Sequence, residues 1–92
     1  MKYILVGTLD RDWIGRQKER LEVSKAKAKE FGITFEAIYY TQGVHDFIDV
    51  VEASDANGLL AFSMWYAKQG YGRMTTMPAF DEAAMEKASG ML

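Results

Sequence analysis

The side chains best suited to chemistry lie around the only histidine of the chain. His45 is followed by Asp46 and Asp49, and it is preceded by Glu36 and Tyr40. An imidazole and carboxylates can exchange protons near neutral pH, and a phenol can orient a substrate, so this composition favours general acid-base chemistry. The chain contains no cysteine, which excludes thiol catalysis and thiolate metal sites. Any shared action of these groups depends on the elements that position them.

The pattern of apolar residues predicts an α+β chain. Four runs rich in β-branched and aromatic residues predict strands, at residues 2–8, 33–41, 44–53 and 71–80. Helical spacing, capping residues and terminal glycines predict helices from Asp10 or Asp12 to Phe31, from Ser54 or Asp55 to Gly70, and over residues 81–88. With right-handed crossovers, the order β-α-β-β-α-β gives a ferredoxin-like fold, a four-stranded antiparallel sheet with both main helices on one face, followed here by a C-terminal helix. We expect one domain over residues 1–92, with Pro78 at a sheet edge.

The turn at Gln42-Gly43 decides which sheet face each candidate residue occupies. A two-residue hairpin loop there places candidate residues on one face as three cross-strand pairs: Tyr40 with His45, Ile38 with Phe47, and Glu36 with Asp49. The other face carries the better apolar set, which we assign to the helices: Ile33, Phe35, Ala37, Tyr39, Val44, Ile48 and Val50. The three pairs are thereby assigned to the open face. A three-residue loop would reverse the assignment.

Two carboxylates directly opposite each other, Glu36 and Asp49, would repel. On a covered surface the pKa of one of them would then be raised, unless a cation such as Arg73 reaches the pair. Three interpretations stay open: solvated positions on a wet face, a charge network with Arg73 or a partner subunit, and catalysis beside His45.

His45 admits a structural and a functional interpretation. It can be a hairpin-end histidine bonded to a tyrosine or to the backbone, or it can be the proton-transfer group of a site. Asp46, its neighbour in an extended strand, points to the opposite face, so the two form no dyad and Asp46 is expected to tie the hairpin end. No metal is expected, because the usual facial arrangement needs a second histidine. Neither Ser54 nor Ser63 lies in a nucleophile-elbow sequence.

Charge and composition exclude several classes of partner. The net charge is −2, and the seven cations between residues 11 and 29 are interleaved with glutamates, which indicates a solvated helix face and no nucleic-acid partner. The apolar runs are shorter than the roughly 18 residues of a membrane span, so no membrane partner is expected. The N-terminus lacks the features of a signal peptide, and we expect a cytoplasmic protein. The glycines form no nucleotide-binding motif, and no cofactor is expected.

An open sheet face with apolar residues predicts self-association. Ile38, Phe47 and Val51 would form an exposed patch there, so a homodimer is expected to cover them. Aromatic residues and a methionine elsewhere are expected in the core or at a subunit contact: Trp13, Met64, Trp65 and Tyr66.

Three segments resemble the GYD domain family of small bacterial and archaeal proteins: FGITFEAIYYT, QGVHDFIDVVEASD and GYGRMTTMPAF. The best matches are Gly43, Asp46, Glu52-Ala53, Asp55, Gly70, Arg73, Thr76 and Ala79-Phe80. The family is named for a Gly-x-Tyr-Asp turn, in which His45 here takes the place of the tyrosine. The resemblance covers nearly the whole chain and implies a ferredoxin-like fold related to the dimeric α+β barrels, in which two sheets face each other across a cavity.

The resemblance implies no single activity, because relatives of that barrel include cofactor-free monooxygenases, lactone isomerases and ligand-binding regulators. Two functions therefore stay open. The first is a binding or sensing module whose homodimer encloses a small apolar or aromatic ligand, contacted by Ile38, Tyr40, Phe47 and Arg73. The second is a cofactor-free enzyme of the monooxygenase or isomerase type, acting on a small aromatic or lactone-like substrate in the same cleft, with His45, Glu36 and Asp49 as catalytic residues.

Overall fold

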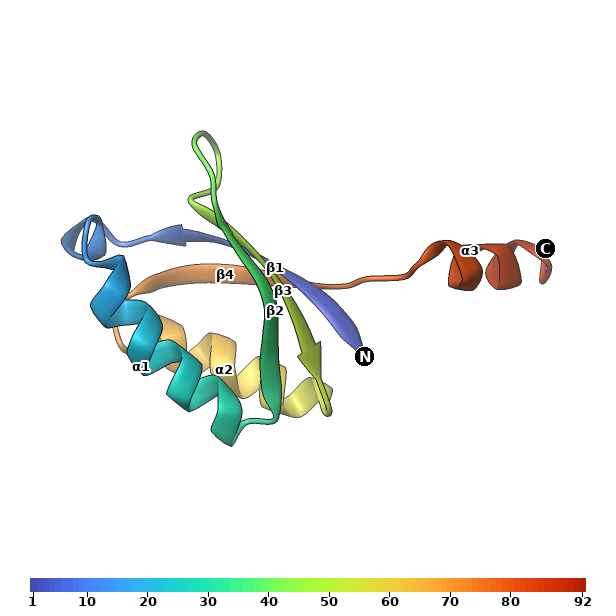
Figure 1. Cartoon of the computed structure of the whole chain (residues 1–92), viewed down its shortest axis with the longest axis horizontal. Helices are drawn as coiled ribbons and strands as arrows, with labels where there is room; N and C mark the ends of the chain where they lie inside the picture. The colour runs from blue at the N-terminus through green and yellow to red at the C-terminus, as the bar shows by residue number, and fades with distance from the viewer.

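A sheet and a pair of helices form the body of the molecule in the computed structural model, which describes residues 1–92 (Figure 1). The elements follow in the order β1 (Lys2–Leu9), a short 3-10 turn (Arg11–Trp13), α1 (Gln17–Glu30), β2 (Ile33–Tyr40), β3 (Phe47–Ala53), α2 (Ala56–Lys68), β4 (Gly72–Pro78) and α3 (Glu82–Ser89). The strand order is β2-β3-β1-β4, and every pair is antiparallel. Both α1 and α2 cover one face of the sheet, so the predicted α+β, ferredoxin-like arrangement is confirmed.

Local signals explain where the helices begin. Asp55 accepts a hydrogen bond from the Asn57 N–H at the start of α2, and Asp81 accepts one from the Ala84 N–H at the start of α3, as the sequence predicts. The first helix differs from the prediction, because Asp10 caps only the 3-10 turn. Gly15 follows with a positive φ of 85°, which is incompatible with a right-handed helix, so α1 begins at Gln17.

The core lies between the sheet and the two helices. Its largest fully buried side chains include Leu5 and Val51 from the sheet and Phe62 and Tyr66 from α2. Aromatic rings extend it toward the end of α2, where Tyr71 lies edge-on to the ring of Trp13 at 4.5 Å between centroids. α1, with 14 residues, is the longest helix, and no helix combines the length and apolar composition needed to cross a bilayer.

The hairpin between β2 and β3 departs from the predicted register. Tyr40 pairs with Phe47 and Ile38 with Asp49, so residues 41–46 form the loop and the predicted two-residue turn is wrong. The reason is a tertiary contact of Asp46, whose Oδ2 accepts the Leu9 N–H at 2.7 Å and whose own N–H donates to the Gly7 carbonyl at 2.8 Å. These bonds attach the end of the loop to β1.

The longer loop shifts the predicted pairing by two residues, from His45 to Phe47 opposite Tyr40, so the alternation of side chains along β3 is the predicted one. The error lies in the choice of the set that packs under the helices. Phe47, Asp49 and Val51 are buried beneath the helices, whereas Ile48 and Val50 lie on the open face, the reverse of the predicted assignment. Gly7 lies opposite Phe47, and a Cβ there would overlap the Phe47 ring, so only glycine leaves room for this ring.

A β-bulge between Phe35 and Ala37 changes the alternation in β2. Ile33 and Phe35 face the helices as predicted, but after the bulge Ile38 and Tyr40 also lie on the helix side. The residues predicted to face the helices after that point, Ala37 and Tyr39, lie instead on the open face with their partners on β3. The predicted open-face set is therefore divided between the two sides of the sheet.

We expect Asp46→Ala to lower the free energy of unfolding by about 2 kcal/mol, because it removes a hydrogen bond between a charged acceptor and a backbone N–H that sets the hairpin loop. Urea denaturation followed by circular dichroism measures the change. The matched control is Val44→Ala in the same loop, whose side chain is 86% exposed and should contribute little. Equal stabilities of the two variants would contradict this role of Asp46.

Candidate functional site

α1 buries a polar stripe where a helix ordinarily buries an apolar one. Arg20, Ser24 and Ala28 follow at intervals of four residues, and they are only 4%, 2% and 0% exposed. Burying a guanidinium and a hydroxyl opposes folding unless both find partners. The place where α1 meets the sheet is therefore built around polar groups.

The guanidinium of Arg20 joins α1 both to the neighbouring helix α2 and to strand β2 of the sheet. It donates to the Tyr66 hydroxyl on α2 at 2.9 Å and to the Tyr40 hydroxyl on β2 at 3.3 Å. Its carbon also lies 5.9 Å from the centroid of the Phe47 ring, close enough for a cation-π contribution. Asp49 reaches the same region from β3 and is 7% exposed. We call Arg20, Ser24, Tyr40, Asp49 and Tyr66 the Arg20 cluster.

Burial sets the protonation of this cluster. Desolvation raises the pKa of Asp49 to about 7, and the nearby Arg20 charge opposes that shift without cancelling it. Desolvation likewise raises the pKa of Tyr66 to about 12, against the charge and hydrogen bond of Arg20. Tyr66 therefore keeps its proton at neutral pH, whereas Asp49 can gain or release one.

The cluster also retains unused hydrogen-bonding capacity. Arg20 Nε, Ser24 Oγ and Asp49 Oδ1 are buried and have no hydrogen-bond partner. None of the four ion pairs of the chain includes Asp49 or Arg20. Buried polar groups are rarely left unpaired in proteins, and a group of them beside a carboxyl with a shifted pKa is typical of a functional site.

A groove borders the cluster at Tyr40. It has a volume of about 430 Å³ and is lined by Leu9, Ile14, Gly15, Gln17, Tyr40, Thr41 and Asp46. The Tyr40 side chain is half exposed, and its hydroxyl contacts Arg20. Tyr40 therefore separates the groove from the buried groups and is bonded to them. We call this hollow the Tyr40 groove.

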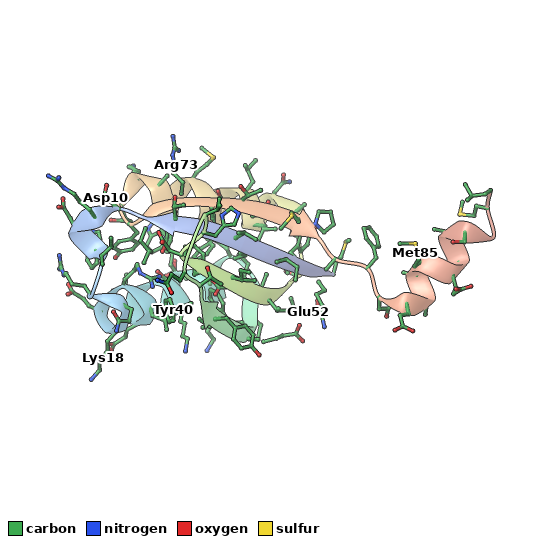
Figure 2. All side chains as sticks on the ribbon, turned by 90° about the horizontal axis from the view of Figure 1, so that it is seen from above. Asp10, Lys18, Tyr40, Glu52, Arg73 and Met85 are labelled. Carbon is green, nitrogen blue, oxygen red and sulfur yellow. The ribbon has the colours of Figure 1, made fainter.

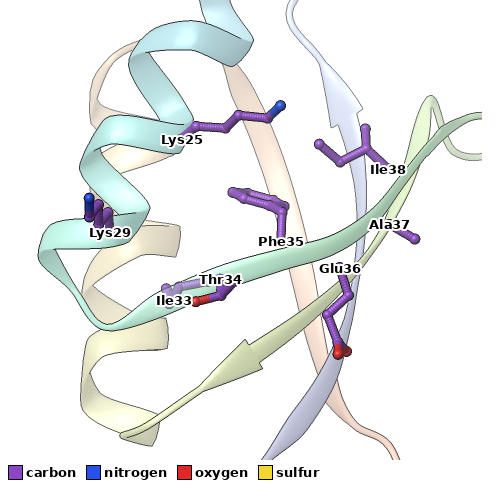
Figure 3. A pocket seen from close by; sticks show the side chains of 8 residues that line it. All are labelled: Lys25, Lys29, Ile33, Thr34, Phe35, Glu36, Ala37 and Ile38. Carbon is purple, nitrogen blue, oxygen red and sulfur yellow. The ribbon is translucent and has the colours of Figure 1, made fainter.

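A second hollow of about 500 Å³ runs along the edge strand β2, beside Lys25 and Lys29 of α1 (Figure 3). Figure 3 shows Phe35 and Glu36 pointing to opposite sides of β2. The Glu36 carboxylate forms an ion pair with Lys2 at 3.2 Å. No member of the Arg20 cluster lines this hollow, whereas Tyr40 of the cluster lines the Tyr40 groove, which makes this hollow the weaker candidate.

The structure brings four of the predicted site residues together on the helix side of the sheet: Ile38, Tyr40, Phe47 and Asp49. The other three lie elsewhere. His45 is exposed in the loop and borders a small hollow of about 130 Å³ that Arg73 also borders, and Glu36 lies near Lys2. The predicted carboxylate pair is wrong, because Ile38 stands opposite Asp49. The roles assigned to these residues stay predictions.

Sequence reasoning missed Arg20, Ser24 and Tyr66 as a polar group. Arg20 is one of seven cations in its segment, and the prediction treated all of them as a solvated face. The usable signal is its spacing from Ala28, an apolar residue near the end of the predicted helix. A residue eight positions before it, and Ser24 between them, lie on that same helix face.

We expect the free energy of unfolding to fall by about 2 to 3 kcal/mol between about pH 5 and pH 8 because of Asp49. The folded-state pKa of Asp49, about 7, lies above the ordinary aspartate pKa of 3.8, so in this range the unfolded chain has released a proton that the folded chain retains. Stability is therefore lost as the pH rises through the folded pKa. Urea denaturation at several pH values measures the slope.

Asp49→Asn should remove this slope, because the amide does not ionise. Glu36→Gln, which changes an exposed carboxyl on the open face, should keep it. A wild-type profile as flat as that of Asp49→Asn would contradict the raised pKa of Asp49.

Comparisons with known proteins agree with the fold and name a family. No sequence among curated proteins matches the chain. Among solved structures, 5-chloro-2-hydroxyhydroquinone dehydrochlorinase (TftG) from Burkholderia phenoliruptrix AC1100, in complex with 2,5-dihydroxybenzoquinone, superposes with a TM-score of 0.62. The match covers 90% of this chain and 97% of that chain at 9% sequence identity, which supports a shared fold. The family model of the GYD domain matches residues 7–89, so this chain belongs to the GYD domain family.

Proposed function

We propose that the Tyr40 groove binds a small, partly aromatic organic molecule and that Asp49 exchanges a proton with it. The observation that carries this proposal is a buried carboxyl whose pKa is about 7 and whose Oδ1 has no partner, close to Arg20. A carboxylate with a pKa near neutrality is suited to accept and return protons, because both of its forms are populated there. The groove provides a place for the molecule that supplies the proton.

The neighbouring groups can take complementary roles. The ionised Asp49 would accept a proton from a hydroxyl or an activated C–H of the bound molecule. The resulting oxyanion would lie near the guanidinium of Arg20, which has an unpaired Nε–H to donate. Return of the same proton to another atom of the molecule completes an isomerisation. Tyr40, bonded to Arg20, would orient the ring.

The ligand class is suggested by the structural neighbour. TftG is described in complex with 2,5-dihydroxybenzoquinone, a small ring that carries both hydroxyl and carbonyl groups. Such a ring has an apolar face for Leu9 and Ile14 and oxygen atoms for the donors of the Arg20 cluster. At 9% identity the neighbour supports this choice of first probe and nothing finer.

A second candidate function is binding or sensing without turnover, in a cleft between the open sheet faces of a homodimer. The observation in its favour is that no helix covers this face, whose centre carries Ile4, Ile48 and Val50. His45 and Arg73 border the hollow at one end of it. We propose the homodimer on the same ground, because an uncovered apolar sheet face favours association.

A matched pair of tyrosine variants tests the main proposal. Tyr40→Phe should weaken binding of 2,5-dihydroxybenzoquinone about fivefold, the equivalent of one hydrogen bond of about 1 kcal/mol. Tyr39→Phe, a neighbour on the open face, should bind as the wild type does. Isothermal titration calorimetry measures both. Equal losses in the two variants, or none in either, would refute binding at the Tyr40 groove.

His45→Ala distinguishes the two candidate sites. Its side chain is exposed in the loop and borders the open-face hollow, so the variant should keep its stability and its affinity if the ligand occupies the Tyr40 groove. A large loss of affinity with unchanged stability would favour the open-face cleft instead. A large loss of stability would remove His45 from any functional role. Calorimetric titration and a thermal melt of the same sample give both results.

A further inference from the structure

The last residues of the chain form an arm that leaves the body. The last hydrogen bond joining it to the sheet runs from the Ala79 N–H to the Lys2 carbonyl at 2.9 Å. Beyond it α3 projects away from the sheet and the other helices (Figure 1), and Met85 on α3 lies far from the body in Figure 2. α3 has no buried residue. We call residues 79–92 the C-terminal arm.

The arm has the properties of a segment that packs against a surface. Phe80 is 69% exposed and Met85 is 64% exposed, and burial of each side chain would contribute about 1.5 to 3 kcal/mol. α3 has only eight residues, and isolated helices shorter than about 12 residues are marginal in water. Three of its four apolar residues, Ala84, Met85 and Ala88, lie on one side of the helix. A stable α3 therefore requires a docking surface for that side.

The arm's own body does not provide this surface. The β1–β4 ladder continues through Pro78 and Ala79, so the strand direction carries the arm past the end of the sheet. No extended contact joins α3 to any other element, and only the start of the arm, at Phe80, Asp81 and Ala84, borders a hollow with Met1, Lys2 and Glu52. Met85 lies outside this hollow, and a second molecule can supply a surface for it.

The open sheet face has the complementary properties. It carries Ile4, Ile48 and Val50 without a covering helix, and Met77 on β4 is 40% exposed beside them. The open face also carries the charges of Lys2, Glu36 and Glu52, which are already in ion pairs, so Arg73 is its unpaired charge. The arm carries Asp81, Glu82 and Glu86 against the single Lys87, whereas Arg73 on the exposed side of β4 belongs to none of the ion pairs of the chain.

We propose that the C-terminal arm of one copy docks on the open sheet face of a second copy, and that the second copy returns the same contact. Each chain carries both complementary surfaces, so a two-fold dimer satisfies both arms and both faces without another protein. This inference rests on the homodimer proposed above and adds the segment that holds it together.

Disulfide cross-linking tests the contact directly, because the chain has no cysteine of its own. A chain with Val50→Cys on the open face is mixed with an isotope-labelled chain with Met85→Cys on the arm, and the mixture is mildly oxidised. We expect a mixed cross-linked dimer, identified by its mass. The control replaces Met85→Cys with Met64→Cys, which lies on α2 with nearly the same exposure, 65% against 64%, and should not cross-link to Val50→Cys.

The oligomeric state of the wild type separates failure of the arm contact from failure of the dimer. Light scattering should give the mass of two chains, and Phe80→Ser with Met85→Ser should weaken dimerisation at least tenfold, while Met64→Ser should not. A wild-type monomer overturns both the dimer and the arm contact. A dimer without the mixed cross-link overturns the arm contact alone. A cross-link formed only within a chain carrying both cysteines also overturns it, because the arm would then fold back on its own sheet.

Discussion

The hydrogen bond from the Leu9 N–H to the Asp46 carboxylate holds the register that sets which β3 side chains lie on each side of the sheet. By attaching the end of the β2–β3 loop to β1, it fixes a loop of residues 41–46 and pairs Tyr40 with Phe47. A shift of one residue in a strand moves every side chain to the opposite face. This contact therefore holds the register in which Asp49 is buried under the helices and Ile48 and Val50 face outward.

Burial of Asp49 near Arg20 helps to explain why α1 can bury a polar stripe against the sheet. A guanidinium beneath a helix would be costly alone, but Arg20 lies between two tyrosine hydroxyls and near a carboxyl. Desolvation and the Arg20 charge act on Asp49 in opposite directions, and the larger effect, desolvation, leaves the pKa near neutrality. A better-paired cluster would be more stable but less able to exchange a proton, because its oxygen and nitrogen atoms would already be occupied.

The predictable part of the structure rests on local signals and the unpredictable part on tertiary contacts. Apolar runs, Asp55, Asp81 and the glycines suffice for the strands, the helices and the ferredoxin-like order. The alternation of β3 is predictable, but which alternate set is buried is not, because the buried set contains Asp49 and the outward set contains the apolar Ile48 and Val50. The loop length depends on a contact between Asp46 and β1 that no neighbouring residue encodes. Similarly, the exposure of each cation in α1 depends on where the helix starts. Gly15 moves that start to Gln17, and the sequence alone does not single out Arg20 among its charged neighbours.

The alternation of side chains along β3 places the carboxyl of the proposed proton exchange on one side of the sheet and the residues of the proposed dimer contact on the other. A carboxyl whose pKa is near neutrality needs desolvation, which the helices provide on one side of β3 through the burial of Asp49. The proposed interface between copies needs apolar side chains at its centre, and the other side of β3 provides Ile48 and Val50. Placing Asp49 outward would put a charge at the centre of that interface and leave Arg20 buried without a counter-charge. The observed register therefore suits both the buried Arg20 cluster and the proposed interface. Exchanging the two faces of β3 would disrupt both of them.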